Sequence, residues 1–283
     1  MSTQNIYELV DLKEDPFRIS PDPRFFYHTK DHDDALQRLY LSIEKKNGLN
    51  IIYGDYGTGK STMAEILQQR YVNKNEYVIA KLATAKAKSE FQFYQLVLNA
   101  FNIKNVARST LASRTALETF SFEKNVGEGK TLILIIDEGE ALTPTNIDIL
   151  RTLLNFEAPD QKFLQLVIFG QMELLPKVRR RRNFVDRISL SYVLNPLNLA
   201  EMRDMIEFRL KIAGWDGSKL FEDEVYDALH EYTKGFPRQV VKLCGISLET
   251  VIMNGDFVVT RNIIREHGEM EKKLYGTRKI RRI

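Results

Sequence analysis

The sequence predicts an α/β fold in which helices flank a parallel sheet, followed by a small all-helical domain. Three observations support this prediction. Short apolar runs alternate with helical segments over the first 195 residues, a glycine-rich turn follows the first of these runs, and strand signals stop after about Asn195. Strands that alternate with helices are typical of a parallel sheet covered on both faces.

Composition limits the class of protein. The 283 residues include 41 Lys and Arg against 38 Asp and Glu, so the net charge is +3, and 43% of the residues are hydrophobic. These values are ordinary for a soluble globular protein and exclude a disordered chain, a collagen-like repeat and a disulfide scaffold. The single cysteine, Cys244, excludes an intramolecular disulfide and a cysteine-rich metal site. The longest apolar runs fall far short of the roughly 20 residues that span a bilayer, so we expect a cytoplasmic protein without membrane insertion.

The first part of the chain carries the signals of the sheet. Residues 6–27 are rich in proline and aromatic residues and lack periodicity, so we expect an extended arm. A helix follows, because apolar residues between Ala35 and Ile43 fall on one helical face. Three helical stretches are then expected at Thr62–Tyr71, Glu90–Phe101 and Asn146–Phe156. The expected strands are Asn50–Tyr53, Tyr77–Leu82, Thr131–Ile136 and Leu164–Phe169.

Helix boundary signals organise the rest of the chain. Thr143 and Pro144 have the residue types of an N-cap and a first helical position. Asn198 and Glu201 have the spacing of a capping box that opens a helix ending at Ala213. We therefore expect an α/β domain that includes the arm (1–195), a helical lid domain (196–270) and a basic C-terminal tail (271–283). The other helices expected in the lid are Glu222–Thr233, Arg238–Met253 and Arg261–His267.

The turn after the first strand carries a phosphate-binding signature. Its sequence, GDYGTGKS, matches GxxxxGK[ST] and lies between a predicted strand and an apolar helix, as this motif requires. Glycines let backbone N–H groups point at an anion, and the helix N-terminus adds partial positive charge. The lysine would reach the β- and γ-phosphates of ATP, and the serine hydroxyl would ligate Mg²⁺. The expected nucleotide-binding residues are Gly54, Asp55, Tyr56, Gly57, Thr58, Gly59, Lys60, Ser61 and Thr62.

Two acidic residues end the most apolar predicted strand. Leu132–Ile136 is a continuous apolar run, as for a central strand buried on both faces, and Asp137 and Glu138 follow it. The carboxyl ends of parallel strands form the crevice in which such sheets bind ligands. We expect Asp137 to hold Mg²⁺ through water and Glu138 to deprotonate the attacking water. The alternative is an exposed acidic turn.

The motifs in this order resemble those of AAA+ ATPases, and more narrowly those of the ExeA/GspA-type group. The similarity covers nearly the whole chain and includes the arm DPFRISPDPRFFY, the helix start HDDAL, the helix end LLNFE, the turn GQMEL and the segment GFPR. It implies an AAA+ P-loop NTPase fold with a helical lid, ATP and Mg²⁺ as cofactors, and hydrolysis of ATP to ADP and phosphate.

The resemblance implies further site residues. Gln171 matches the polar sensor that contacts the γ-phosphate or the attacking water, and Arg238 matches the second sensor in the lid. Arg187 matches the arginine that reaches a neighbouring subunit's nucleotide, but Arg179–Arg182 are close in sequence and leave its identity open. Phe17 would line the adenine pocket. A guanidinium stabilises a transferring phosphoryl group, so hydrolysis would depend on assembly into a homo-oligomeric ring or helical filament.

Two polar stretches are candidates for contacts with double-stranded DNA. Related transposition ATPases place basic and hydroxyl residues after the second strand and after the next helix. The corresponding residues here are Lys86, Lys88, Arg108 and Ser109, which would contact phosphates without sequence preference. The alternative is a solvated surface. The last fourteen residues carry six Lys and Arg against one Glu, and they would hold DNA, dock a transposase or targeting protein, or fray in solvent.

Three functions stay open. Secretion-type members are longer, with a transmembrane helix and an envelope-facing domain after the ATPase, and neither follows here. The main expectation is therefore a stand-alone TnsC/TniB-type regulator that oligomerises on DNA, selects target sites and recruits a transposase. The alternatives are a cytoplasmic ATPase of a secretion or pilus assembly system, and a replication initiator or helicase loader.

Overall fold

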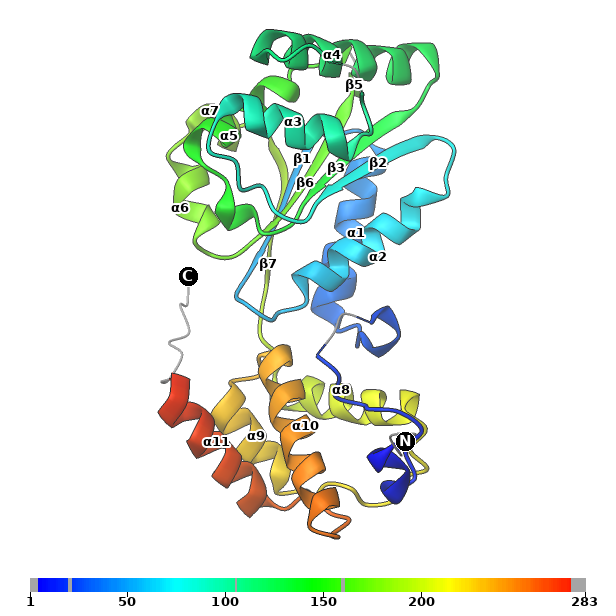
Figure 1. The fold of residues 1–283 in the computed structure, drawn as a ribbon, viewed down its shortest axis with the longest axis vertical. Coiled ribbons are helices and arrows are strands. Elements are labelled where there is room, and N and C mark those ends of the chain that lie inside the picture. The colour runs from blue at the N-terminus through cyan, green and yellow to red at the C-terminus, as the bar shows by residue number, and fades with distance from the viewer. Residues whose placement is uncertain (1–4, 20–21, 105, 159–160, 276–283) are drawn as a thin grey trace. The chain divides into compact units, whose positions relative to one another are not determined.

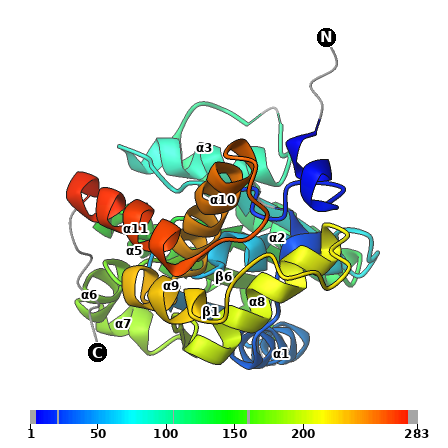
Figure 2. The ribbon, with the colours of Figure 1, turned by 90° about the horizontal axis from the view of Figure 1, so that it is seen from below.

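Contacts divide the chain into two units in the computed structural model, which describes residues 5–19, 22–104, 106–158 and 161–275. One is an α/β unit that comprises Lys30–Tyr56 and Lys60–Asn195. The other is a helical unit that comprises Met1–Thr29, Gly57–Gly59 and Pro196–Ile283. Figure 1 shows the strands gathered in the first unit, and Figures 1 and 2 show the helices of the second.

A five-stranded parallel sheet lies at the centre of the α/β unit, as the sequence predicts, with the strand order β2-β3-β6-β1-β7. Its register brings three strand ends to one edge: Tyr53 on β1 lies opposite Gly170 on β6, and Ile136 on β3 lies opposite Ile168 on β6. The segments that follow β1, β3 and β6 therefore leave the sheet side by side. The strands are β1 (Leu49–Gly54), β2 (Tyr77–Leu82), β3 (Thr131–Ile136), β6 (Leu164–Gly170) and β7 (Ile188–Leu194).

The strand β7 is an addition to the four expected strands. It pairs with β1 at the edge of the sheet, and side-chain exposure alternates along it. This alternation follows from a period of two in the sequence, in which Ser189 and Ser191 separate Ile188, Leu190 and Tyr192. The run is less uniformly apolar than the central strands because only part of an edge strand faces the core.

Helices cover both faces of the sheet (Figure 1). The helices α1 (Lys30–Glu44) and α2 (Lys60–Val72) contact β1, whereas α3 (Glu90–Ala100) contacts β2 and packs with α5 (Pro144–Leu153). Thr143 caps α5 by accepting a hydrogen bond from the Asn146 N–H at 3.2 Å, as expected. Further elements of this unit are α4 (Thr110–Phe122), which packs on α3, α6 (Leu174–Arg179), α7 (Arg182–Val185) and the hairpin β4 (Glu157–Ala158) and β5 (Gln161–Lys162).

The described part of the helical unit contains four α-helices. The expected capping box opens the first of them: the Glu201 N–H donates to Asn198 Oδ1 at 2.9 Å, and the Asn198 N–H donates to Glu201 Oε2 at 3.0 Å. The last helix continues to Tyr275, eight residues beyond the expected His267, so the start of the predicted tail is helical. Residues 276–283 of that tail lie outside the described residues. The helices are α8 (Leu199–Ile212), α9 (Val225–Thr233), α10 (Pro237–Met253) and α11 (Arg261–Tyr275).

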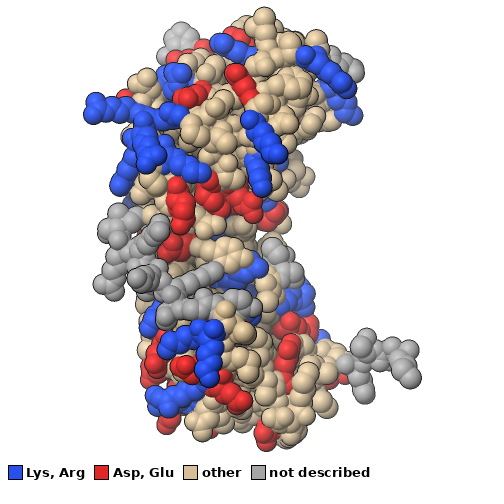
Figure 3. Space-filling model, turned by 60° about the vertical axis from the view of Figure 1, so that its left-hand side comes forward, with Lys and Arg blue, Asp and Glu red and all other residues tan. Residues whose placement is uncertain are grey.

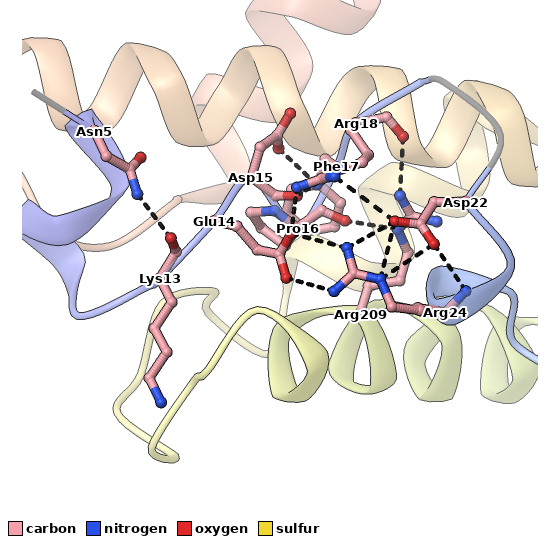
Figure 4. Close-up of polar contacts among 10 residues, drawn as sticks. All are labelled: Asn5, Lys13, Glu14, Asp15, Pro16, Phe17, Arg18, Asp22, Arg24 and Arg209. Atoms are coloured by element: carbon pink, nitrogen blue, oxygen red, sulfur yellow. Dashed lines mark hydrogen bonds and ion pairs between the residues drawn. The ribbon is translucent and has the colours of Figure 1, made fainter. Parts of the chain in front are cut away.

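The N-terminal arm packs with the helical unit, whereas the sequence-based division places it with the α/β domain. The reason is the Arg209 side chain on α8, which is 8% exposed and donates to three carbonyls of the arm (Figure 4). Its Nε donates to Pro16 O at 2.7 Å, and its two Nη atoms donate to Phe25 O and Arg18 O at 3.0 Å each. Burial lowers the pKa of this guanidinium to about 10, so it stays charged at neutral pH. A buried cation with three carbonyl partners fixes the path of the arm.

Within the described residues, no helix has both the length and the apolar character to cross a bilayer.

Candidate active site at the carboxyl edge of the sheet

The loop between β1 and α2 has the backbone of a phosphate-binding turn. Gly57 and Gly59 have φ angles of +86° and +93°, in the left-handed region that residues with a Cβ rarely adopt. Two such residues separated by Thr58 allow the backbone to wrap tightly before α2 begins at Lys60. The motif predicted from the sequence is therefore placed as expected, after a strand and at a helix N-terminus.

Lys60 points back into this loop. Its Nζ donates to Gly54 O and to Asp55 O, both at 2.8 Å, and the residue is only 8% exposed. Burial lowers the pKa of Lys60, while the negative charges of Glu140 and Asp137 oppose that shift. The ammonium group is thus held by loop carbonyls, which phosphate oxygens could replace as partners.

The residues expected to hold Mg²⁺ present hard oxygen atoms. Ser61 is exposed in the first turn of α2, beside Thr62, and Asp137 is 8% exposed at the end of β3. Asp137 Oδ1 accepts a hydrogen bond from the Glu138 N–H at 2.9 Å, which leaves its other oxygen for a further contact. Mg²⁺ in nucleotide sites is usually held by one or two protein groups together with phosphate oxygens and water, so this donor set fits the ion.

Glu138 has an unusual backbone conformation. Its φ of +50° lies in the left-handed region, although it is not glycine, and its side chain is exposed. Such strain is tolerated only where surrounding structure fixes it, and it often occurs at functional sites. Asp137 is buried just before this turn, whereas the side chain of Glu138 is exposed.

A contact that the sequence analysis missed joins the segments after β3 and β6. The carboxylate of Glu140 accepts hydrogen bonds from the Gln171 backbone N–H at 2.9 Å and from Gln171 Nε2 at 2.8 Å. Gln171 therefore lies at the same edge as Asp137. The only sequence signal of this contact is a third acidic residue in the segment DEGE after β3, because the motif assigns roles only to the first two.

Arg238 and Phe17 both lie in the helical unit. Arg238 is the second residue of α10, and its backbone N–H donates to the O of Gly57, which contacts assign to the same unit, at 3.3 Å. Phe17 is 3% exposed and packs edge-on against Phe221, with 5.9 Å between the ring centres. This burial gives Phe17 a structural role in the helical core, and its contact with adenine stays a prediction.

Arg187 lies at the opposite edge of the sheet from the P-loop, because Ile188 after it pairs with Leu49 at the start of β1. Its Nη1 donates to Asn183 O at 2.6 Å, and its Nη2 donates to Asn155 Oδ1 at 2.9 Å. Arg181, in the neighbouring basic run, forms an ion pair with Asp148 at 3.6 Å, whereas Arg179, Arg180 and Arg182 are exposed. Figure 3 shows Lys and Arg side chains gathered on a face of the α/β unit, next to a group of acidic side chains.

The residues expected to contact DNA lie in two segments. Lys86 and Lys88 are exposed and alternate with the buried Ala85 and Ala87 in an extended stretch after β2. Arg108 is also exposed, before α4. The Ser109 hydroxyl caps α4 by accepting a hydrogen bond from the Ala112 N–H at 3.0 Å. Ser109 therefore has a local structural role, and its contact with DNA stays a prediction.

A family model matches part of the chain, and the fold is that of known structures. Residues 43–178 match the family model described as an AAA domain. With a five-stranded parallel sheet, a P-loop and an acidic pair at the end of β3, followed by a helical region, the chain has the AAA+ ATPase fold. An AAA domain implies nucleotide binding, typically with Mg²⁺.

The chain is similar to one protein named for secretion and to two solved structures with other names. The chain is 28% identical over 278 residues to general secretion pathway protein A of Aeromonas hydrophila. The aligned region covers 97% of this chain and 49% of that protein. Among solved structures, it is similar to Cdc6p from Pyrobaculum aerophilum, with a TM-score of 0.68 and 16% identity over 92% of this chain and 71% of that one. It is also similar to the Aeropyrum pernix ORC1 protein in complex with DNA, with a TM-score of 0.64 and 15% identity over 95% and 70% of the two chains.

These comparisons bear unequally on the open functions. Almost the whole of this chain matches the secretion protein, but the chain spans only about half the length of that protein. The likeness to the two solved structures establishes the fold alone, because the identities are 15–16%. The comparisons therefore favour the secretion alternative over the transposition regulator that the sequence by itself suggests.

Proposed function

We propose that the protein is an ATP hydrolase that works as a nucleotide-controlled switch in a homo-oligomer. The observation that carries the proposal is the convergence of Lys60, Asp137, Glu138 and Gln171 at one edge of the sheet. Lys60 follows β1, the Asp137–Glu138 pair follows β3, and Gln171 follows β6. The register of these three strands aligns their ends. The four residue types are those needed to bind a triphosphate and activate water.

The roles of these residues follow from their chemistry. The Lys60 ammonium exchanges its carbonyl partners for phosphate oxygens. Glu138, exposed after the end of β3, accepts a proton from the attacking water, while Gln171 orients that water or contacts the terminal phosphate. A Mg²⁺ ion held by Ser61 and Asp137 would neutralise phosphate charge.

The position of Arg187 supports the proposal that ATP hydrolysis depends on assembly of the oligomer. Its hydrogen bonds to Asn155 and Asn183 lie at the exposed surface of the α/β unit. A guanidinium from one copy would complete the site of the next copy and stabilise the charge on the transferring phosphoryl group. Oligomerisation and the identity of this arginine are both parts of the proposal.

The proposal is tested by ATP turnover measured against protein concentration. We expect the rate per subunit to rise with concentration as copies assemble, and Arg187→Ala to lower it by about 10³-fold or more. Mixing Arg187→Ala with Glu138→Gln should restore part of the rate, because mixed contacts join an intact base to an intact arginine. A rate per subunit that is independent of concentration and of Arg187 would contradict this part of the proposal.

A role in a secretion system is the better supported biological context. It depends on the similarity to general secretion pathway protein A, which covers 97% of this chain. The client in this context would be a protein component of that pathway, and the ATPase would act by changing between assembled and released states.

A second candidate is binding to duplex DNA, which the exposed lysines after β2 favour. Asn146 Nδ2 donates to Ala85 O at 3.1 Å and so ties this stretch to α5. Residues two apart in an extended segment are about 7 Å apart, so Lys86 and Lys88 could contact neighbouring phosphates. Such binding would be independent of sequence and sensitive to salt.

Replacing Lys86, Lys88 and Arg108 by glutamine tests this candidate. If each contacts one phosphate, the slope of log K against log salt concentration should fall by about 2.7. Fluorescence anisotropy of labelled duplex DNA at several salt concentrations measures that slope. Lys74→Gln, a change at an exposed lysine after α2, is the control and should leave it unchanged. An unchanged slope in the triple variant would remove these residues from the candidate site.

A further inference from the structure

We infer that Glu140 is a positioning residue for ATP hydrolysis, which fixes the side-chain amide of Gln171. The inference rests on the proposed ATPase function and names a residue that the P-loop and the Asp137–Glu138 pair do not include. Glu140 lies in the short turn Gly139–Ala141, two residues after Glu138.

The contact between Glu140 and Gln171 is bidentate. Oε2 of Glu140 accepts from the backbone N–H of Gln171, and Oε1 accepts from its side-chain Nε2, at 2.9 and 2.8 Å. A carboxylate accepts hydrogen bonds and has none to donate, so it selects the amide orientation in which Nε2 faces it. The Oε1 of Gln171 is then directed away from Glu140, and this atom can accept a hydrogen bond from water.

The backbone is shaped to allow this contact. A Cβ on Gly139 would lie 2.5 Å from Ile168 Cγ2 and 3.1 Å from Phe169 O, and a Cβ on Gly170 would lie 3.5 Å from the backbone N of Glu140. The turn after β3 and the end of β6 therefore approach each other at two glycines. Lys177 completes the arrangement, because its Nζ donates to the backbone oxygen of Glu140 and, at 3.2 Å, to Leu142 O.

Glu140 also acts on the P-loop through its charge. Among the neighbouring charges that hold up the pKa of Lys60 against the effect of burial, Glu140 is the largest contributor, ahead of Asp137. Loss of the Glu140 carboxylate should disturb the geometry of hydrolysis more than the binding of nucleotide, because Lys60 keeps its loop carbonyls and its other acidic neighbours.

The test is a double-mutant cycle between Glu140→Gln and Gln171→Ala, with kcat, KM and nucleotide affinity measured for each variant. Glutamine at 140 can accept one of the two hydrogen bonds, so we expect kcat to fall about 10- to 100-fold, as for a small misplacement in an active site. The affinity for ATP should change by less than about threefold. The double variant should be no slower than Gln171→Ala alone, because both changes remove the same orientation of the amide.

Two controls separate positioning from other effects. Glu173→Gln changes an exposed carboxylate in the turn after β6 and leaves both Glu140–Gln171 hydrogen bonds in place, so kcat should stay within about twofold of the original. If Glu140→Gln fails to fold by circular dichroism, Glu140→Asp takes its place in the cycle, since it keeps the charge but shortens the reach to Gln171.

The outcomes are distinguishable from a failure of the ATPase proposal itself. Additive effects of the two changes, or an unchanged kcat in Glu140→Gln while Gln171→Ala is slow, would overturn the inference alone. If the unaltered protein does not hydrolyse ATP, or if Gln171→Ala hydrolyses it at the original rate, the proposed catalytic site is wrong and the inference is overturned with it.

Discussion

Replacing Lys60 with alanine should weaken ATP binding about 100-fold and abolish ATP-dependent assembly. The ammonium group is nearly buried, and its two loop carbonyls at 2.8 Å hold it where phosphate oxygens would bind. A charge-assisted hydrogen bond contributes about 1.5–3 kcal/mol, and every 1.4 kcal/mol corresponds to a factor of about ten in affinity. Fluorescent nucleotide titration measures the affinity, and light scattering with ATP measures assembly.

The control for this variant is Lys74→Ala, which removes an exposed lysine after α2. It should bind ATP and assemble like the original protein. If Lys60→Ala still assembles when ATP is added, the assignment of the P-loop is wrong.

The same lysine predicts how binding depends on pH. Burial lowers the pKa of Lys60, and only the protonated form attracts a triphosphate. Affinity should therefore be full below this lowered pKa and fall as pH rises through it, at a lower pH than for a lysine in water, whose pKa is about 10.4. Nucleotide titrations of Lys60→Ala over the same pH range should lack this component.

Replacing Glu138 with glutamine should separate binding from hydrolysis. The side chain is exposed at the end of β3, and Lys60 donates its hydrogen bonds to Gly54 O and Asp55 O. The change should therefore leave the affinity for ATP within about threefold of the original. Loss of a general base should lower kcat by about 10²- to 10⁴-fold. The assembled form should therefore accumulate in the presence of ATP, because the step that releases it is slow.

Single-turnover hydrolysis and sedimentation with ATP measure these two effects. Glu173→Gln is again the matched control, since it changes an exposed carboxylate in the turn after β6 to its amide. Undiminished hydrolysis by Glu138→Gln would show that another group accepts the proton.

Much of the fold could be predicted because local signals agree with tertiary structure. The strands β1, β3 and β6 are buried along their whole length, so their residues form apolar runs that need no context to interpret. The caps at Thr143 and Asn198 form as expected because they satisfy backbone groups locally. The edge strand β7 was missed because half of its residues face solvent.

Only part of the candidate site could be predicted from the sequence. The P-loop and the Asp137–Glu138 pair are contiguous in sequence and have fixed spacing, so the chain order alone identifies them. The contact between Glu140 and Gln171 joins residues 31 positions apart, and only the register of β3 with β6 brings them together. The position of the arm depends on Arg209, which is 184 to 193 positions away from its three partners and carries no motif.

Isothermal titration calorimetry of the purified protein with ATP and Mg²⁺, beside Lys60→Ala, tests the central claim most directly. We expect saturable binding of one nucleotide per chain in the unaltered protein and binding about 100-fold weaker in the variant. If the unaltered protein takes up no adenine nucleotide, or if the variant binds it equally well, the edge of the sheet where β1, β3 and β6 end is not an ATP site.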